Sequence, residues 1–165
     1  MNNQKLSDFE LYFQIDESNR VNLFAVDDSA VPKSLAELEA DIPPLFKLAN
    51  EVSSLEQSAL GPLRNLGDIA QELTTFLQAQ SRKIDLIMSH ILASEQPEDN
   101  SIYCDSYGGG GIKFTSEHLY TLGQKFRTKL FLQHEASAVY CYSEVVAIEK
   151  QDHEHYQYTL LFVSI

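Results

Sequence analysis

The sequence predicts an α+β protein that combines a small antiparallel β-barrel with long helices, the longest a heptad helix that forms a coiled-coil oligomer. Two observations carry this prediction. Residues 33–96 hold helix signals, whereas residues 100–165 are rich in β-branched and aromatic residues in partial alternation. The 165 residues suffice for one domain with an oligomerising segment, and 44% hydrophobic residues is typical of a chain that buries a core.

Residues 1–30 are expected to form a β-hairpin. The segments ELYFQI and RVNLFAV, both within Phe9–Val26, are rich in residues that favour strands. Asp16–Asn19, between them, has the composition of a turn. We expect this hairpin to be part of the barrel.

Residues 33–96 are expected to be helical and to serve oligomerisation. The segment SLAE matches a capping box, with Ser34 as the N-cap and Glu37 reaching back to its amide. No proline interrupts the chain after Pro62 until beyond Glu95. A helix over this stretch would measure roughly 50 Å at 1.5 Å per residue.

An apolar seam runs along this long helix with gaps of four and three residues in turn. Such a period of 3.5 is typical of a coiled coil rather than of a helix that lies on a globular core. The a positions are Ala70, Leu77, Ile84 and Ile91, and the d positions are Leu66, Leu73, Gln80 and Ile87.

A seam of this length requires a second helix, because a small β domain is too short to cover it. The partner is either an earlier helix of the same chain or the same helix of another chain, and we prefer the second. β-branched residues at both a and d, here Ile84, Ile87 and Ile91, favour three or four helices over two. We expect a homotetramer, with a trimer as the next choice; the polar Gln80 would fix the register.

The charge excludes two classes of partner. A net charge of −12 argues against nucleic acids and anionic membranes, which require a basic surface. No apolar run approaches the roughly 18 residues of a membrane span. The N-terminus lacks the apolar region of a signal peptide, so we expect a cytoplasmic protein.

Signatures of catalysis and metal binding are sparse, so we expect no enzyme, no metal and no cofactor. Cys104 and Cys141 are expected to be free, half-buried thiols, since no CxxC motif is present and a zinc site needs four ligands. Asp152–His155, the segment DHEH, could hold a metal but is expected to be a polar hairpin loop. The alternative left open is a small enzyme that uses Cys104 or Cys141 with a histidine.

Four consecutive glycines, Gly108–Gly111, run directly into the apolar segment GIKF. They match neither a Walker A loop, since no Lys-Ser/Thr follows, nor a dinucleotide fingerprint, since they open a strand rather than a helix. We expect them to make the tight turn into that strand. A nest of backbone amides that takes an anion is the alternative.

The C-terminal block, from SYGGGGIKFTSEHLYTLGQKFRTKLFL through AVYCYSEVVAIEK to YQYTLLFVSI, resembles the PilZ domain. That family is a small six-stranded bacterial β-barrel that commonly binds cyclic di-GMP. The resemblance covers residues 100–165 and implies a PilZ-like barrel, to which the N-terminal hairpin would add a missing strand. Some PilZ proteins also carry long heptad helices that assemble four chains.

The family's ligand motifs are degenerate in this chain. With Gly111 as the glycine of the Asp/Asn-x-Ser-x-x-Gly motif, Ser106 stands at the acidic position and Gly108 at the serine position. The family's Arg-x-x-x-Arg motif has no counterpart, because no two of the four arginines are four positions apart. The candidate ligand-binding residues are Ser106, Gly108, Gly111 and Lys113.

The resemblance therefore implies an atypical, oligomeric PilZ-domain adaptor in bacterial signalling. Its partners would be copies of itself and a signalling protein that the sequence does not identify, and it would not bind cyclic di-GMP in the usual way. The alternative is a cyclic di-GMP receptor that uses non-standard groups, namely Lys113, Arg127 and the glycine backbone.

Overall fold

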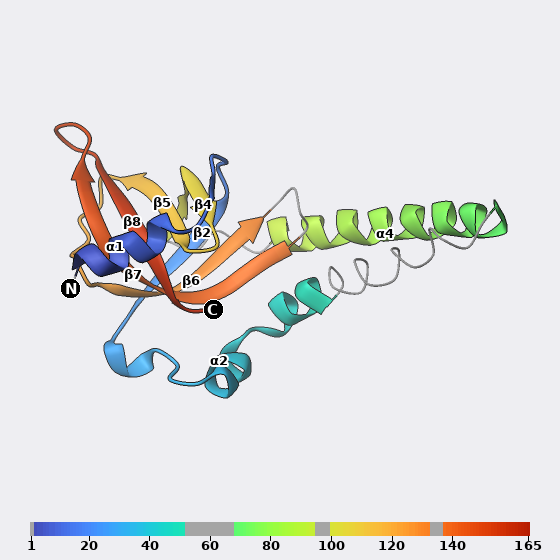
Figure 1. Cartoon of the computed structure of the whole chain (residues 1–165), viewed down its shortest axis with the longest axis horizontal. Helices are drawn as coiled ribbons and strands as arrows, with labels where there is room; N and C mark the ends of the chain where they lie inside the picture. Colours follow the sequence, from blue (N-terminus) through green and yellow to red (C-terminus); the bar gives the residue numbers. More distant parts are fainter. Residues whose placement is uncertain (1, 52–67, 95–99, 133–136) are drawn as a thin grey trace. The chain divides into compact units, whose positions relative to one another are not determined.

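The computed structural model describes residues 2–51, 68–94, 100–132 and 137–165. Its sheet has eight strands in the order β1-β4-β5-β8-β7-β6-β2-β3 (Figure 1). The strands are β1 (Gln14–Ile15), β2 (Arg20–Val26), β3 (Ser101–Tyr103), β4 (Ser106–Gly108), β5 (Gly111–Ser116), β6 (Lys125–Leu132), β7 (Ser137–Lys150) and β8 (Tyr156–Ser164).

A two-residue connection closes this sheet into a barrel. β3 lies at one end of the strand order and β4 near the other, yet only Cys104 and Asp105 separate them in the chain. Cys104 N donates to Asn19 O at 3.0 Å, whereas Asp105 N donates to Lys113 O of β5 at 2.7 Å. The sheet must roll up, because three peptide steps span no more than about 11 Å.

Alternate residues of the strands form the core of the barrel. On β5 and β8, Ile112 is opposite Leu160 and Phe114 is opposite Tyr158, and all four are fully buried. This alternation is the one that the C-terminal block predicted. Further buried residues from β2 and β6 are Val21, Leu23, Phe126 and Leu130.

The chain divides into two compact units. The first comprises residues 1–41, 97–131 and 139–165, which hold the barrel strands, α1 (Asn2–Glu10), the 3-10 turn η1 (Asp28–Ala30) and α2 (Leu35–Asp41). The second comprises residues 42–96 and 132–138, with α4 (Asp68–Ser94) and a helical segment described over residues 44–51. None of the helices in the described residues is long and apolar enough to cross a membrane.

The predicted N-terminal hairpin is wrong. Residues 2–10 form α1, which lies beside β8 (Figure 1). β1 pairs with β4, whereas β2 pairs with β6 and β3, so the two segments do not pair with each other. The strand-forming composition of ELYFQI was misleading because only Gln14 and Ile15 form a strand, while Leu11 and Phe13 are exposed in the connection that follows α1. Both β1 and β2 nevertheless join the barrel sheet, β1 beside β4 and β2 beside β6.

α2 is held at both ends by polar contacts. Ser34 Oγ accepts a hydrogen bond from Glu37 N at 3.3 Å, but Glu37 Oε2 reaches back to Lys33 N rather than to the Ser34 amide. At the other end, Tyr142 Oη donates to Asp41 Oδ2 at 2.6 Å, and Tyr140 Oη donates to the same oxygen. These two bonds lower the pKa of the Asp41 carboxyl.

Candidate assembly face and glycine turn

α4 is the longest helix of the described chain. Its 27 residues contain no glycine or proline, so no residue interrupts the ladder of hydrogen bonds, and it measures about 40 Å at 1.5 Å per residue. The predicted helix covers residues 62–95; residues 62–67 and 95 lie outside the described residues.

One face of α4 is packed inside its own unit. Met88 and Leu92 are buried, and Met88 forms a small core with Ala49 and the partly buried Leu45. Both Leu45 and Ala49 belong to the helical segment of residues 44–51. An earlier helix of the same chain therefore does pack on α4, as the intramolecular alternative expected, but on the Met88 face.

The predicted seam lies on a different face of α4. Ile87 is 59% exposed whereas Met88, the next residue, is 4% exposed. Ile91 and the buried Leu92 repeat the same relationship one turn later. Because one residue rotates the helix by about 100°, the seam lies roughly a quarter turn away from the packed face.

The seam is exposed along most of its described length. Leu73, Ile84, Ile87 and Ile91 are exposed, and so is the flanking Phe76. Leu77 and Gln80 are half-buried. The side chain of Ala70 and the whole of Leu66 lie outside the described residues. The assignment of these residues to an intermolecular seam stays a prediction.

The four glycines form the turn between β4 and β5. Gly108 pairs with Gly111, and Gly109 and Gly110 make the turn. This is the tight entry into the β5 strand that the sequence predicted. Lys113 of β5 is opposite Ser106 of β4, so the fold brings all four candidate ligand residues into one hairpin.

The N-terminal segment covers this turn. A Cβ atom would overlap Phe13 O if added to Gly108, and would lie 2.8 Å from Tyr12 Cδ2 if added to Gly110. At Gly111 it would lie 3.1 Å from Phe9 Cε2. The glycines are thus required because the chain's own residues 9–14 lie against their backbone. Sequence reasoning missed this contact.

The remaining candidate groups lie apart. Lys113 Nζ lies 5.6 Å from the centre of the Phe9 ring, beside the glycine turn. Arg127 of β6 has its guanidinium 4.8 Å from the centre of the Phe24 ring. Two strands, β8 and β7, lie between β5 and β6 in the sheet. The two cations lie over different aromatic rings and do not share one clamp.

Both cysteines are buried. Cys104 is 1% exposed and Cys141 fully buried, so they are more enclosed than the half-buried thiols expected from the sequence. Burial raises the pKa of both thiols. A nucleophilic cysteine requires the opposite shift, so neither thiol is prepared for attack at neutral pH.

The DHEH segment forms the loop between β7 and β8, as predicted. Asp152 Oδ1 accepts hydrogen bonds from Glu154 N at 2.9 Å and from His155 N at 2.8 Å. These bonds lower the pKa of Asp152 to about 2. Within the described ranges, no three His, Cys, Asp or Glu side chains gather as metal ligands would.

Comparison with known proteins relates this architecture to one fold. No protein-family model and no curated protein matches the chain. Among solved structures, it is similar to a pathogenic protein from Xanthomonas campestris, described as a tetrameric PilZ domain self-assembled through an unusual helical bundle. The TM-score is 0.51 at 18% sequence identity, over 96% of this chain and 83% of that one. The chain therefore has a PilZ-like fold, an antiparallel barrel with an added helical unit.

Proposed function

We propose that this chain is an oligomeric adaptor of PilZ-like fold in bacterial signalling, which assembles through the seam of α4 and does not bind cyclic di-GMP in the usual way. The observation that carries the proposal is the exposure of the seam. Leu73, Ile84, Ile87 and Ile91 recur at coiled-coil spacing, yet they are exposed while the adjacent face of α4 is packed.

Four chains are the favoured assembly. A row of exposed isoleucines is unfavourable in water, and burying each one contributes about 1.5–3 kcal/mol. Isoleucine at both a and d positions favours bundles of more than two helices. The similar Xanthomonas protein is a tetramer assembled through a helical bundle, which supports the same number here.

The glycine turn supports the second half of the proposal. Tyr12 lies over Gly109 and Gly110, at the turn that aligns with the family's ligand motif. A chain of net charge −12 without a paired arginine clamp would also repel a dianionic nucleotide. Both features favour a barrel that has kept its turn for structural reasons.

An adaptor requires surface for a second protein, and the barrel unit provides one. Leu11 and Phe13 are exposed by 78% and 83% in the connection that follows α1. Large apolar side chains exposed together are common where another protein binds. Since both thiols are buried with raised pKa values, binding is a better-supported role than cysteine catalysis. We place this role in the cytoplasm.

Light scattering of the purified chain and of Ile84→Asp tests the assembly. We expect the mass of four chains for the wild type and of one chain for the variant, with unchanged far-UV circular dichroism. The reason is that each copy would otherwise bury an unpaired carboxylate in the bundle. A wild-type monomer, or an Ile84→Asp protein that stays tetrameric, would contradict the proposal.

A cyclic di-GMP receptor that uses non-standard residues is the second candidate. The position of Lys113 favours it, because this half-exposed cation lies next to the glycine turn. Calorimetric titration with cyclic di-GMP separates the two candidates. The adaptor predicts no heat of binding; micromolar binding that Lys113→Ala abolishes would establish the receptor instead.

A further inference from the structure

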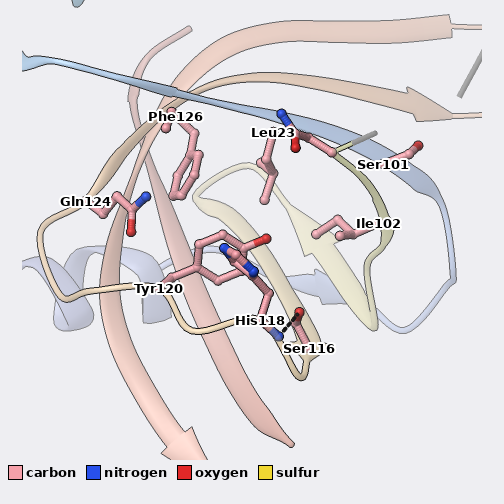
Figure 2. A pocket seen from close by; sticks show the side chains of 10 residues that line it. Leu23, Ser101, Ile102, Ser116, His118, Tyr120, Gln124 and Phe126 are labelled. Carbon is pink, nitrogen blue, oxygen red and sulfur yellow. Dashed lines mark hydrogen bonds between the residues drawn. The ribbon is translucent and has the colours of Figure 1, made fainter. Parts of the chain in front are cut away.

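A cavity of about 270 Å³ opens at the end of the barrel away from the glycine turn. β5 begins at that turn and ends at Ser116, which lines the cavity, so the two sites are about 17 Å apart along the strand. Figure 2 shows side chains from β2, β6 and the segment after β5 around a common space. The mouth of a β-barrel is a common place for a ligand.

The lining combines apolar walls with uncharged polar groups. Leu23, Ile102 and Phe126 supply apolar surface, and His118 and Gln124 supply polar groups (Figure 2). Among the described residues that line the cavity, none is Asp, Glu, Lys or Arg. A phosphate or another ionic group would find no opposite charge here, so the lining selects an uncharged molecule.

Two polar side chains of the lining are set for hydrogen bonding. Gln124 Oε1 accepts from Thr121 N at 3.0 Å, which leaves the NH₂ group of Gln124 as a donor. Ser116 Oγ accepts from His118 N at 3.0 Å, and this bond fixes the backbone that carries the imidazole (Figure 2). An uncharged imidazole offers one donor and one acceptor nitrogen.

The aromatic wall of the cavity is held rigidly. The Tyr120 ring lies edge-to-face with Phe126 at 5.4 Å and with the buried Tyr158 at 5.1 Å. Tyr158 Oη accepts from Tyr120 N at 3.3 Å and donates to His118 O at 3.0 Å. A buried tyrosine thus fixes the backbone of both His118 and Tyr120, so little entropy is lost when a ligand binds.

The volume sets the size of the ligand. An apolar cavity of about 150 Å³ takes one benzene molecule. A cavity of about 270 Å³ therefore accommodates two fused rings, whereas a dinucleotide is far too large. His118 and Tyr120 both line the cavity, and the centres of their rings are 4.7 Å apart.

We propose that this cavity binds a small, uncharged, planar nitrogen heterocycle of about two fused rings. The molecule packs against the Tyr120 and His118 rings, accepts a hydrogen bond from the Gln124 NH₂ group and donates one to the imidazole. The site is independent of α4 and of the glycine turn.

Titration of the full-length protein with 2-aminopurine tests this site. This probe is uncharged and bicyclic, carries donors and acceptors, and loses fluorescence when it stacks on an aromatic ring. The chain contains no tryptophan, so the probe can be excited without a protein signal. We expect saturable quenching; no saturation up to millimolar protein would overturn the proposal.

Two variants locate the binding. Ala25→Phe fills the cavity from an exposed position of β2, and His118→Ala removes an exposed ring, so neither disturbs the core. We expect each to weaken binding by about tenfold or more. Ala36→Phe, an equal change at an exposed position of α2, is the control and keeps wild-type affinity. Wild-type affinity for 2-aminopurine in all three variants, with unchanged circular dichroism, would also overturn the proposal.

Discussion

Gly111 and Leu160 lie so close together that a Cβ atom on Gly111 would overlap the Leu160 carbonyl oxygen. Gly111 also has a φ of 156°, which side chains rarely adopt. Gly123 has a φ of 82°, but nothing lies within 4 Å of the place where its Cβ would be. A side chain at Gly111 would therefore meet both steric overlap and backbone strain, whereas a side chain at Gly123 would meet backbone strain alone.

We expect Gly111→Ala to lower the free energy of unfolding by about 3 kcal/mol or more, because strain and overpacking both act there. Gly123→Ala should cost only about 1–2 kcal/mol, since strain acts alone. Urea denaturation of both variants measures the difference. Equal losses would mean that the β5–β8 approach at Leu160 yields easily to a methyl group.

Ile87→Asp should affect the assembly and Met88→Ala the stability of the single chain, although the two residues are adjacent. Ile87→Asp should dissociate the assembly and leave each chain folded, because Ile87 is exposed in the single chain. Met88→Ala should lower the free energy of unfolding by about 2–5 kcal/mol, because it leaves a cavity against Ala49. Sedimentation velocity gives the mass and thermal denaturation gives the stability.

Thr75→Asp is the matched control for Ile87→Asp. It adds the same charge at an exposed position on the opposite side of α4 from the seam, so the mass should not change. Dissociation by Thr75→Asp would indicate a general effect of charge rather than a seam.

The Asp41 bonds predict a loss of stability at both ends of the pH range. The tyrosine hydroxyls lower the pKa of Asp41 below its ordinary value of 3.8, so their contribution is complete above about pH 4 and is lost as the pH falls further. Burial, followed by the bond to Asp41, raises the pKa of Tyr140 and Tyr142 above 10. Their contribution is thus complete below about pH 10 and is lost as the pH rises beyond it.

Asp41→Asn should remove the loss of stability at acidic pH that Asp41 causes. It should also lower the free energy of unfolding by about 1 kcal/mol at neutral pH. Thermal denaturation between pH 3 and pH 7 follows the effect. An unchanged acid slope in the variant would show that other carboxylates dominate.

Alkylation by iodoacetamide at neutral pH should be slow in the native protein and fast in urea. Burial raises the pKa of both Cys104 and Cys141, so little thiolate forms while the chain is folded. Mass spectrometry after timed quenching counts the modified thiols. One rapidly alkylated cysteine in the native protein would revive the alternative of a cysteine enzyme.

The C-terminal strands could be predicted from the sequence because their pattern is local. Ile112 and Phe114 alternate with Lys113 and Thr115, and their pairing partners Tyr158 and Leu160 alternate with Gln157 and Thr159. The N-terminal segment could not be predicted in this way. Phe9 is equally suited to a strand by propensity, and its contact with Gly111 lies about a hundred positions away.

The candidate sites likewise include one feature that a local sequence pattern predicts and others that it does not. The heptad spacing of Ile84, Ile87 and Ile91 is visible in the sequence, so the exposed face could be located before the fold was known. The contact that Gly109 and Gly110 make could not be predicted, because glycine is equally suited to a site where a ligand approaches and to one where another segment of the chain approaches. Only the position of Tyr12 in the structure shows that a segment of the chain lies there. The cavity at His118 likewise depends on Leu23 and Phe126, which the barrel brings together from distant strands.

The pairing of β2 with β6 also constrains the order in which the chain folds. Val21 pairs with Leu130, more than a hundred positions later, so the first strands made on the ribosome have no partner until most of the chain has emerged. α4 depends on contacts within its own segment and can form earlier. Barrel closure is therefore a late event of high contact order. Until it occurs, Val21 and Leu23, which the closed barrel buries, are open to chaperones and to aggregation.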